Sequence, residues 1–207
     1  MKKTIILPLA AALFLLGNQM KGQVAATTFD VSPLLIGETV PDGNLTDSKG
    51  NTVSFHSLLS QPAVVIFYRG DWCPNCITHF NTEITPNVKA ITDMGYKLIA
   101  ISPDSPENLV STSGKTKIDA SMFYSDGDVS LSKGFGIAHK HGEFMKDAII
   151  RASGGKNPDP NLPVPAVFVI GTDKKILFEY INPNGPGSAL RMKWTLLQPV
   201  LQALKQI

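Results

Sequence analysis

The sequence has few cysteines and no long apolar segment. Only two of its 207 residues are cysteines, too few for a secreted scaffold cross-linked by several disulfides. Its main apolar stretch, residues 5–16, is interrupted by Pro8, whereas a membrane-spanning helix needs about 20 residues. Neither sign of charge is in large excess, with 19 basic and 17 acidic residues, and no basic patch is interleaved with aromatic residues. Nucleic acid is therefore not an expected partner.

Residues 1–23 have the features of an export signal. Lys2 and Lys3 form a charged start, the apolar stretch follows, and small residues near positions 22–26 offer several cleavage points. Removal of the signal takes away three lysines and leaves 16 basic against 17 acidic residues. We therefore expect an exported protein, periplasmic or otherwise extracytoplasmic, with no stable membrane anchor after the signal is removed.

The remaining chain, residues 24–207, is expected to form a single α/β domain. Residues 41–55 place turn residues between two short strand patterns and predict a hairpin at a sheet edge. Residues 62–68 and 96–102 are continuous apolar runs, typical of strands buried on both faces. Between them, apolar residues recur every three or four positions, which predicts a helix from Pro74 that bends near Pro86. A strand, helix and strand in this order indicate a parallel pair with a right-handed crossover.

The second half of the chain predicts further strands and helices. Residues 139–163 contain a helix pattern at 143–152 and a loop rich in Gly, Asn and Pro, and we interpret them as an insertion. The other expected elements are a brief strand at 121–124, a short helix at 129–135, an antiparallel hairpin at 164–170 and 175–181, and a closing helix at 188–204. The predicted fold class is a mixed central sheet with helices on both faces and an N-terminal β-hairpin.

Both cysteines lie in residues 67–76, FYRGDWCPNC, where the first buried strand gives way to a helix. Open α/β sheets place their sites at the carboxyl ends of strands. Unpaired N–H groups and the positive end of the helix dipole favour a thiolate at Cys73. Cys76 lies on the same turn, close enough to resolve a mixed disulfide, and Pro74 suits the first helical turn. The pair therefore predicts reversible thiol-disulfide exchange, which requires no metal or organic cofactor.

Two other interpretations of the cysteine pair stay open. An inert disulfide closing a loop of four residues would contribute only about 2 kcal/mol on the chain-entropy model. Half of a zinc site would need two more ligands, which could come only from His56, His79, His139 and His141. His139 and His141 alternate like a copper-binding pair, although a solvated loop is the simpler interpretation.

The neighbours of the cysteines also allow two interpretations each. Trp72 either shields the disulfide and contacts a substrate or packs in the fold. Arg69 either favours the thiolate by its charge or pairs with Asp71 at the surface. His79 either relays a proton or is a half-exposed helix residue, which we expect. The first strand contains no carboxylate that could serve as a buried base, so the proton acceptor is unassigned.

Four stretches carry a resemblance to a known family. They are residues 67–76, AISPDSPENL at 100–109, YSDGD at 124–128 and VPAVFVIGTDKKILFEYINPN at 164–184. Together they resemble the peroxiredoxin-like branch of the alkyl hydroperoxide reductase and thiol-specific antioxidant (AhpC/TSA) family. WCPNC with the later Val164–Pro165 step also looks like the thioredoxin fold, whose cis-proline faces the cysteines. The resemblance implies a thioredoxin-like fold and a cis Pro165 that accepts partner backbone, with an ordinary strand-start proline as the alternative.

The resemblance also shows departures from the family pattern. The family's peroxidase stretch is an aromatic residue, Tyr and Pro followed by Thr-x-x-Cys. Alignment places Cys76 at the peroxidatic cysteine, Cys73 at the threonine and Arg69 at the proline. Pro165 falls about where the family supplies an arginine. These departures remove groups that normally polarise a peroxide and leave disulfide exchange intact.

Three functions follow in order of preference. The leading hypothesis is an exported thiol-disulfide oxidoreductase that acts on protein or small-molecule thiols and disulfides through Cys73 and Cys76. The alternative is a thiol peroxidase that reduces hydrogen peroxide or alkyl hydroperoxides, with Cys76 oxidised to sulfenic acid and Cys73 resolving it. The third is a copper-binding or partner-docking module that uses the cysteines without turnover.

Overall fold

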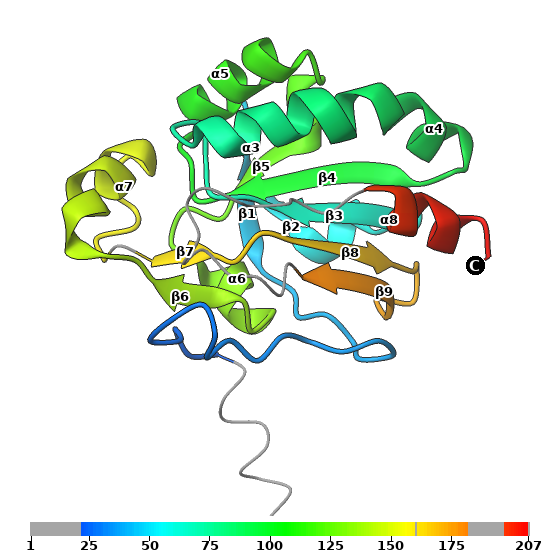
Figure 1. Cartoon of the computed structure of the whole chain (residues 1–207), viewed down its shortest axis with the longest axis horizontal. Coiled ribbons are helices and arrows are strands. Elements are labelled where there is room, and N and C mark those ends of the chain that lie inside the picture. Colours follow the sequence, from blue (N-terminus) through cyan, green and yellow to red (C-terminus); the bar gives the residue numbers. More distant parts are fainter. Residues whose placement is uncertain (1–21, 160, 182–196, 207) are drawn as a thin grey trace, which may run out of the picture.

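The structure is a computed structural model that describes residues 22–159, 161–181 and 197–206. The expected export signal lies almost entirely outside these residues. No helix within the described ranges is long and apolar enough to cross a membrane. Helices lie on both faces of a central sheet (Figure 1), as the sequence predicts.

The central sheet has seven strands in the order β2-β1-β5-β4-β3-β8-β9. Strand β4 is parallel to both β3 and β5, and the other neighbouring pairs are antiparallel, so the sheet is mixed as expected. The parallel pair runs from Ala63 opposite Lys97 to Phe67 opposite Ile101. The strands are β1 (Asn44–Asp47), β2 (Thr52–Ser54), β3 (Ala63–Phe67), β4 (Lys97–Ser102), β5 (Phe123–Ser125), β8 (Ala166–Ile170) and β9 (Ile176–Ile181).

The N-terminal hairpin predicted for residues 41–55 is confirmed by β1 and β2. Asp47 fixes its turn, because one carboxylate oxygen accepts the backbone N–H groups of Lys49 at 2.9 Å and Asn51 at 2.8 Å. Strand β1 pairs with β5, so the hairpin extends the sheet at its edge. The short helix α2 (Phe55–Leu58) follows directly, capped by Ser54.

One long helical segment connects β3 to β4 and is irregular in its middle. It consists of α3 (Pro74–His79), a π-helical turn η1 (Phe80–Ile84), a 3₁₀ turn η2 (Thr85–Asn87) and α4 (Val88–Asp93). The irregular turns surround Pro86, which has no N–H to donate to the helical ladder. The segment ends at Gly95, whose φ of 85° terminates the helix. The predicted helix, its bend and its end are confirmed.

In the sequence, helix α5 (Pro106–Thr116) precedes β5 and helix α6 (Ser130–Gly134) follows it. The predicted strand at 121–124 is present but begins at Phe123. A 3₁₀ turn, η3 (Ala120–Met122), takes the preceding positions because the Asp119 side chain accepts the Ser121 N–H. The buried Asp126 carboxylate accepts the N–H groups of the first turn of α6 and so fixes where that helix begins.

A small second sheet lies at one end of the molecule. It pairs β6 (Ala138–Lys140) with β7 (Asn161–Pro163) in antiparallel fashion, and η4 (Glu143–Met145) and α7 (Lys146–Ala152) lie between them. The helix predicted at 143–152 is therefore confirmed. The N-terminal segment joins this ribbon, because Ala25 donates to Ala138 and accepts from Lys140, both at 2.9 Å. Residues more than a hundred positions apart thus lie side by side (Figure 1).

Strands β8 and β9 form the predicted antiparallel hairpin beside β3. The C-terminal helix α8 (Leu197–Leu204) packs Val200 and Leu204 onto the face of the sheet that α3 and α4 cover. The first part of the helix predicted at 188–204 lies outside the described residues.

Successive side chains of β3 enter two different hydrophobic cores. Val65 and Phe67 enter the core under α2 and α6, which we call the aromatic core, because the rings of Phe55, Phe67, Phe135 and Phe168 contact one another there. Val64 and Ile66 enter the core under α3, α4, α5 and α8, which we call the cysteine core because it contains both cysteines. This division follows from the two-residue period of a strand.

Candidate active site

The cysteine loop, residues 68–73, leads from β3 to Cys73 and turns at Gly70. Its φ is 140°, and a Cβ there would lie 2.7 Å from both Asp104 Oδ1 and Trp72 Nε1. Only glycine therefore fits without moving the loop. The neighbouring Asp71 N–H donates to Asp104 Oδ2 at 2.8 Å. The loop is thus held against the segment that follows β4, and this contact sets the position from which α3 starts.

Cys73 is the N-cap residue of α3, with an extended backbone. Its Sγ accepts the backbone N–H of Cys76 at 3.3 Å, so the sulfur takes the place that a serine or aspartate oxygen takes at other helix starts. Pro74 lies in the first turn, where a missing N–H costs nothing. Both cysteines are free thiols and buried, with Cys73 1% and Cys76 0% exposed.

The two thiols have opposite electrostatic environments. A hydrogen bond from the Cys76 thiol is the main cause that lowers the pKa of Cys73 to about 6, with the Arg69 charge and the Cys76 N–H adding to it against the effect of burial. Complete burial raises the pKa of Cys76 well above its ordinary value, and donation to Cys73 adds to this. Near neutral pH the pair therefore holds one thiolate, at Cys73, and one thiol, at Cys76.

Arg69 lies directly beside the first cysteine. Its Nη2 donates to Cys73 Sγ at 3.1 Å, and its guanidinium carbon lies 5.9 Å from the centre of the Trp72 ring. The Arg69–Asp71 pair that we considered is absent, because Asp71 instead binds Lys115 at 2.7 Å. The geometry therefore agrees with the first interpretation of Arg69, in which its charge favours a thiolate at Cys73.

Sequence reasoning missed Asp104. This carboxyl is 1% exposed, accepts from the Asp71 N–H and the Ser102 hydroxyl, and has no hydrogen-bond partner for Oδ1 among the described residues. Burial raises its pKa to about 7, against the effect of these hydrogen bonds. The sequence could have pointed to it: β4 is parallel to β3, so the acid that follows β4 must lie near the cysteine loop.

The histidines depart from our expectations. His79, expected to be half-exposed, is 4% exposed on the inner side of α3, and burial lowers its pKa to about 4. His139, expected in a solvated loop, is 3% exposed because β6 pairs with both β7 and the N-terminal segment. No cluster of three or more His, Cys, Asp or Glu side chains that could hold a metal ion occurs in the part of the chain that the structure describes.

The prediction of a cis peptide bond before Pro165 is wrong. The described residues contain no cis peptide bond. Val164 donates its N–H to Ile137 at 2.8 Å, and Ala166 begins β8 opposite Phe67, so the chain must stay extended on both sides of the proline. A trans bond after an extended residue meets this requirement. Pro165 thus links the ribbon to the main sheet as an ordinary strand-start proline.

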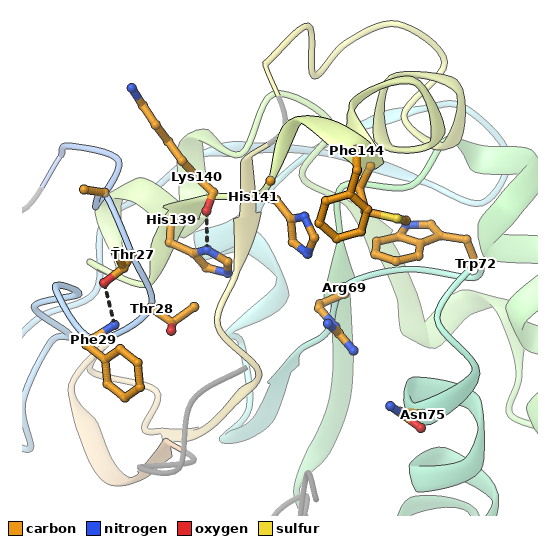
Figure 2. A pocket seen from close by; sticks show the side chains of 13 residues that line it. Thr27, Thr28, Phe29, Arg69, Trp72, Asn75, His139, Lys140, His141 and Phe144 are labelled. Carbon is orange, nitrogen blue, oxygen red and sulfur yellow. Dashed lines mark hydrogen bonds between the residues drawn. The ribbon is translucent and has the colours of Figure 1, made fainter. Parts of the chain in front are cut away.

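A cavity of about 530 Å³ opens beside the cysteine loop. Three segments build it: residues 26–29, the loop and first turn of α3, and residues 139–145. Figure 2 shows Trp72 and Phe144 toward one end of the cavity, with Arg69, His139 and His141 between the segments that line it. The cavity is lined by Ala26, Thr27, Thr28, Phe29, Arg69, Trp72, Asn75, His139, Lys140, His141, Gly142, Phe144 and Met145. Arg69 therefore contacts both the cavity and Cys73.

Comparison with known proteins identifies similar sequences. Residues 36–178 match the model of the AhpC/TSA family. The chain is 24% identical over 159 residues to a Mycobacterium tuberculosis protein named as a putative peroxiredoxin, covering 76% of this chain and 91% of that protein.

Solved structures agree as well. Peroxidoxin BcpB from Mycobacterium tuberculosis aligns with a TM-score of 0.62 at 21% identity, over 83% of this chain and 97% of that one. PrxQ from Xylella fastidiosa, solved as a cysteine mutant, aligns with a TM-score of 0.61 at 20% identity, over 84% and 98%. These similarities confirm the predicted thioredoxin-like fold.

The match to the family model extends over well more than half of the chain, and it includes the strand, the cysteine loop and the helix described above. The resemblance inferred from four sequence stretches is confirmed. The chain is a thiol-dependent oxidoreductase with a thioredoxin-like fold, and it belongs to the AhpC/TSA family.

Proposed function

We propose that the chain is a thiol-disulfide oxidoreductase in which Cys73 attacks first and Cys76 resolves. The observation that carries this proposal is the set of hydrogen bonds to Cys73 Sγ, from Arg69 Nη2 at 3.1 Å and from the Cys76 N–H at 3.3 Å. These contacts favour a thiolate at Cys73, and the thiolate is the nucleophile in exchange. Cys76 is more deeply buried and keeps its proton, as a resolving thiol must until it is needed.

The reaction balances without a cofactor. The Cys73 thiolate attacks one sulfur of a substrate disulfide, forms a mixed disulfide and releases the other half as a thiolate, which takes a proton from water. Cys76 then loses its proton and attacks the Cys73 sulfur. An intramolecular disulfide forms and the second half leaves as a thiol. The substrate gains two electrons, and an external dithiol returns the enzyme to its reduced form.

Thiol peroxidase is the second candidate function, and family membership favours it. The sequence alignment favours the peroxidatic role for Cys76, whereas the hydrogen bonds favour the more stable thiolate at Cys73. In a peroxidase built on this pair, the Cys73 thiolate would attack one peroxide oxygen and break the O–O bond. Cys73 becomes a sulfenic acid, and the alkoxide or hydroxide released takes a proton from water. Condensation with Cys76 would then form the disulfide and release water.

Single serine variants of the two cysteines test the order of attack. Cys76→Ser is expected to accumulate a mixed disulfide with an added disulfide substrate, because the resolving thiol is missing. Cys73→Ser is expected to form none and to lose reductase activity. Intact-mass measurement detects both outcomes. If Cys73→Ser still consumes peroxide with an added thiol while Cys76→Ser does not, Cys76 is the attacking residue and the proposed function is wrong.

The proposal includes export and the class of partner. Residues 1–23 support cleavage and transfer to an extracytoplasmic compartment, where protein or small-molecule disulfides are available. The partners are thiols and disulfides, with peroxides as the alternative oxidant. Cell fractionation followed by N-terminal sequencing of the mature protein is expected to find it outside the cytoplasm, beginning near residue 24. Retention of Met1 in a cytoplasmic fraction would contradict export.

A further inference from the structure

The cavity beside the cysteine loop is too large for a peroxide alone. Hydrogen peroxide needs on the order of twice the roughly 30 Å³ that a water molecule takes in the liquid, whereas the cavity measures about 530 Å³. Pockets of 300–1,000 Å³ are typical of sites for organic ligands. The aromatic rings of Phe29, Trp72 and Phe144 lie on its walls (Figure 2), and Phe29 and Phe144 are 74% and 85% exposed. The cavity is therefore suited to a molecule with apolar groups.

Three buried nitrogen atoms on the lining residues have no hydrogen-bond partner among the described residues. They are His139 Nε2, His141 Nδ1 and Arg69 Nε. Buried polar groups in folded proteins are normally paired, and leaving one unpaired costs about 1–3 kcal/mol. His139 is 3% exposed, so bulk water does not compensate for the loss. All three side chains line the same cavity (Figure 2), so a ligand in it is the available partner for them.

His139 Nε2 and Arg69 Nε have opposite hydrogen-bonding roles, one as an acceptor and the other as a donor. His139 Nδ1 lies 2.8 Å from the Lys140 carbonyl oxygen, and a carbonyl only accepts, so Nδ1 carries the hydrogen. Burial lowers the pKa of His139 to about 4, so the ring is neutral and Nε2 is an acceptor. Arg69 Nε is always a donor. One donor and one acceptor together match a peptide group, whereas a carboxylate would satisfy Arg69 and face the lone pair of His139.

We propose that the cavity binds the peptide group next to a substrate cystine, with its C=O accepting from Arg69 Nε and its N–H donating to His139 Nε2. This assignment rests on the proposed disulfide exchange and adds a substrate class to it: disulfides carried by peptides or unfolded protein segments. Arg69 connects recognition to reaction, because Nη2 of the same guanidinium contacts Cys73 Sγ at 3.1 Å. A peptide group on Nε therefore brings its cystine sulfur next to the thiolate.

Two disulfides that differ in their peptide groups test the proposal. The first is cystine blocked as its N-acetyl methylamide, and the second is 2-hydroxyethyl disulfide, which has no amide. Stopped-flow measurement gives the rate constant for oxidation of the reduced full-length protein by each. His139→Phe keeps a ring of similar size and removes the acceptor. It is expected to lower the rate constant for blocked cystine about tenfold, the effect of one hydrogen bond, and to change that for 2-hydroxyethyl disulfide less than twofold.

Three further variants keep the test decisive. His139→Gln restores an acceptor and is expected to recover part of the rate with blocked cystine. His56→Phe is the matched control, because His56 lies in α2, contacts the Val40 carbonyl oxygen and does not line the cavity. It should change neither rate. Phe144→Ala alters an exposed rim residue and leaves the core intact. It is expected to lower the rate two- to fivefold for a blocked phenylalanyl-cystine, and not for 2-hydroxyethyl disulfide.

Each outcome has a distinct meaning. Equal losses with both disulfides in His139→Phe, or no loss with either in His139→Phe and Phe144→Ala, would overturn the peptide-binding assignment and leave disulfide exchange standing. Failure of the unmodified protein to react with either disulfide would overturn both proposals. A disulfide-bonded, unfolded protein serves as a third substrate. If its rate also depends on His139, the substrates include protein segments; if not, they are small peptides.

Discussion

The two faces of the central sheet are built by alternating residues of the same strands, yet they differ in chemistry. In the aromatic core four phenylalanine rings contact one another, and the buried carboxylate beside it, Asp126, caps the first turn of α6. The cysteine core contains two thiols, and the loop that holds them rests on a buried carboxyl, Asp104. Because successive strand positions face opposite sides, we expect a substitution to act mainly on the face that it occupies. The reactive groups lie on the cysteine side, and substitutions on each side test whether the two cores are independent.

The largest effect on stability is expected from Phe135→Ala in the aromatic core. The Phe135 ring lies 5.7 Å from that of Phe55, 4.9 Å from that of Phe67 and 5.0 Å from that of Phe168, measured between centroids. Its removal is expected to lower the free energy of unfolding by about 3–5 kcal/mol, measured in urea. The pKa of Cys73, measured from the pH dependence of alkylation, should stay near 6. A shift of this pKa would mean that the two faces are coupled.

Asp104→Asn is expected to have the next largest effect, and one that depends on pH. The folded-state pKa of Asp104, about 7, lies above its ordinary value of 3.8, so its contribution to stability is complete below pH 4 and is lost as pH rises through 7. Asparagine does not ionise. The variant should therefore gain on the order of 2–4 kcal/mol relative to the unmodified protein between pH 4 and 8. If the free energies of unfolding of the variant and the unmodified protein change equally with pH across this range, Asp104 is not buried in a protonated state.

Gly70→Ala is expected to lower stability by about 1–3 kcal/mol and also to disturb the thiolate. The added Cβ meets Asp104 Oδ1 and Trp72 Nε1 at 2.7 Å and sits on a backbone with φ of 140°. Gly50→Ala is the matched control, because Gly50 also has a positive φ, 88°, but nothing lies within 4 Å of its Cβ position. A change in Cys73 alkylation should occur only in Gly70→Ala. If both variants change Cys73 alkylation equally, the close approach of Gly70 to Asp104 and Trp72 does not position the thiolate.

The smallest effect on stability, but a clear one on reactivity, is expected from Arg69→Met. Loss of the charge and of the 3.1 Å hydrogen bond should raise the pKa of Cys73 by about one unit from its value near 6. Alkylation at pH 6 should slow several-fold, while the rate above pH 9 stays the same because the thiolate is then complete in both proteins. Arg151→Met, at an exposed position on α7, is the control. An unchanged pKa would show that the Cys76 thiol and N–H stabilise the thiolate without Arg69.

The elements that the sequence predicted correctly depend on local patterns. The apolar runs of β3 and β4, the periodic residues of α3 and α4 and the turn at Asp47 each fold as their own residues require. The carboxyl-end rule then placed the cysteines at the edge of the parallel strands without knowledge of any contact.

The errors concern contacts between distant segments. His139 is buried where Ala25 pairs with its strand, and the trans Pro165 follows Val164, which donates to Ile137. Asp104 joins the site through the pairing of β3 with β4, which the sequence predicted, although residues 67–76 alone do not identify it. The contacts of Ala25 and Val164 have no local pattern, so periodicity and spacing could not predict them.

The pairing of Ala25 with β6 has a practical consequence for how the protein is produced. Residues 26–29 form one wall of the cavity, and they lie immediately after the expected cleavage region. A recombinant form that starts at Asp30, or that carries a bulky tag directly before Ala25, would have both thiols and the whole sheet but an altered entrance. Its disulfide kinetics would then describe a truncated enzyme, so the start of the expressed chain is itself an experimental variable.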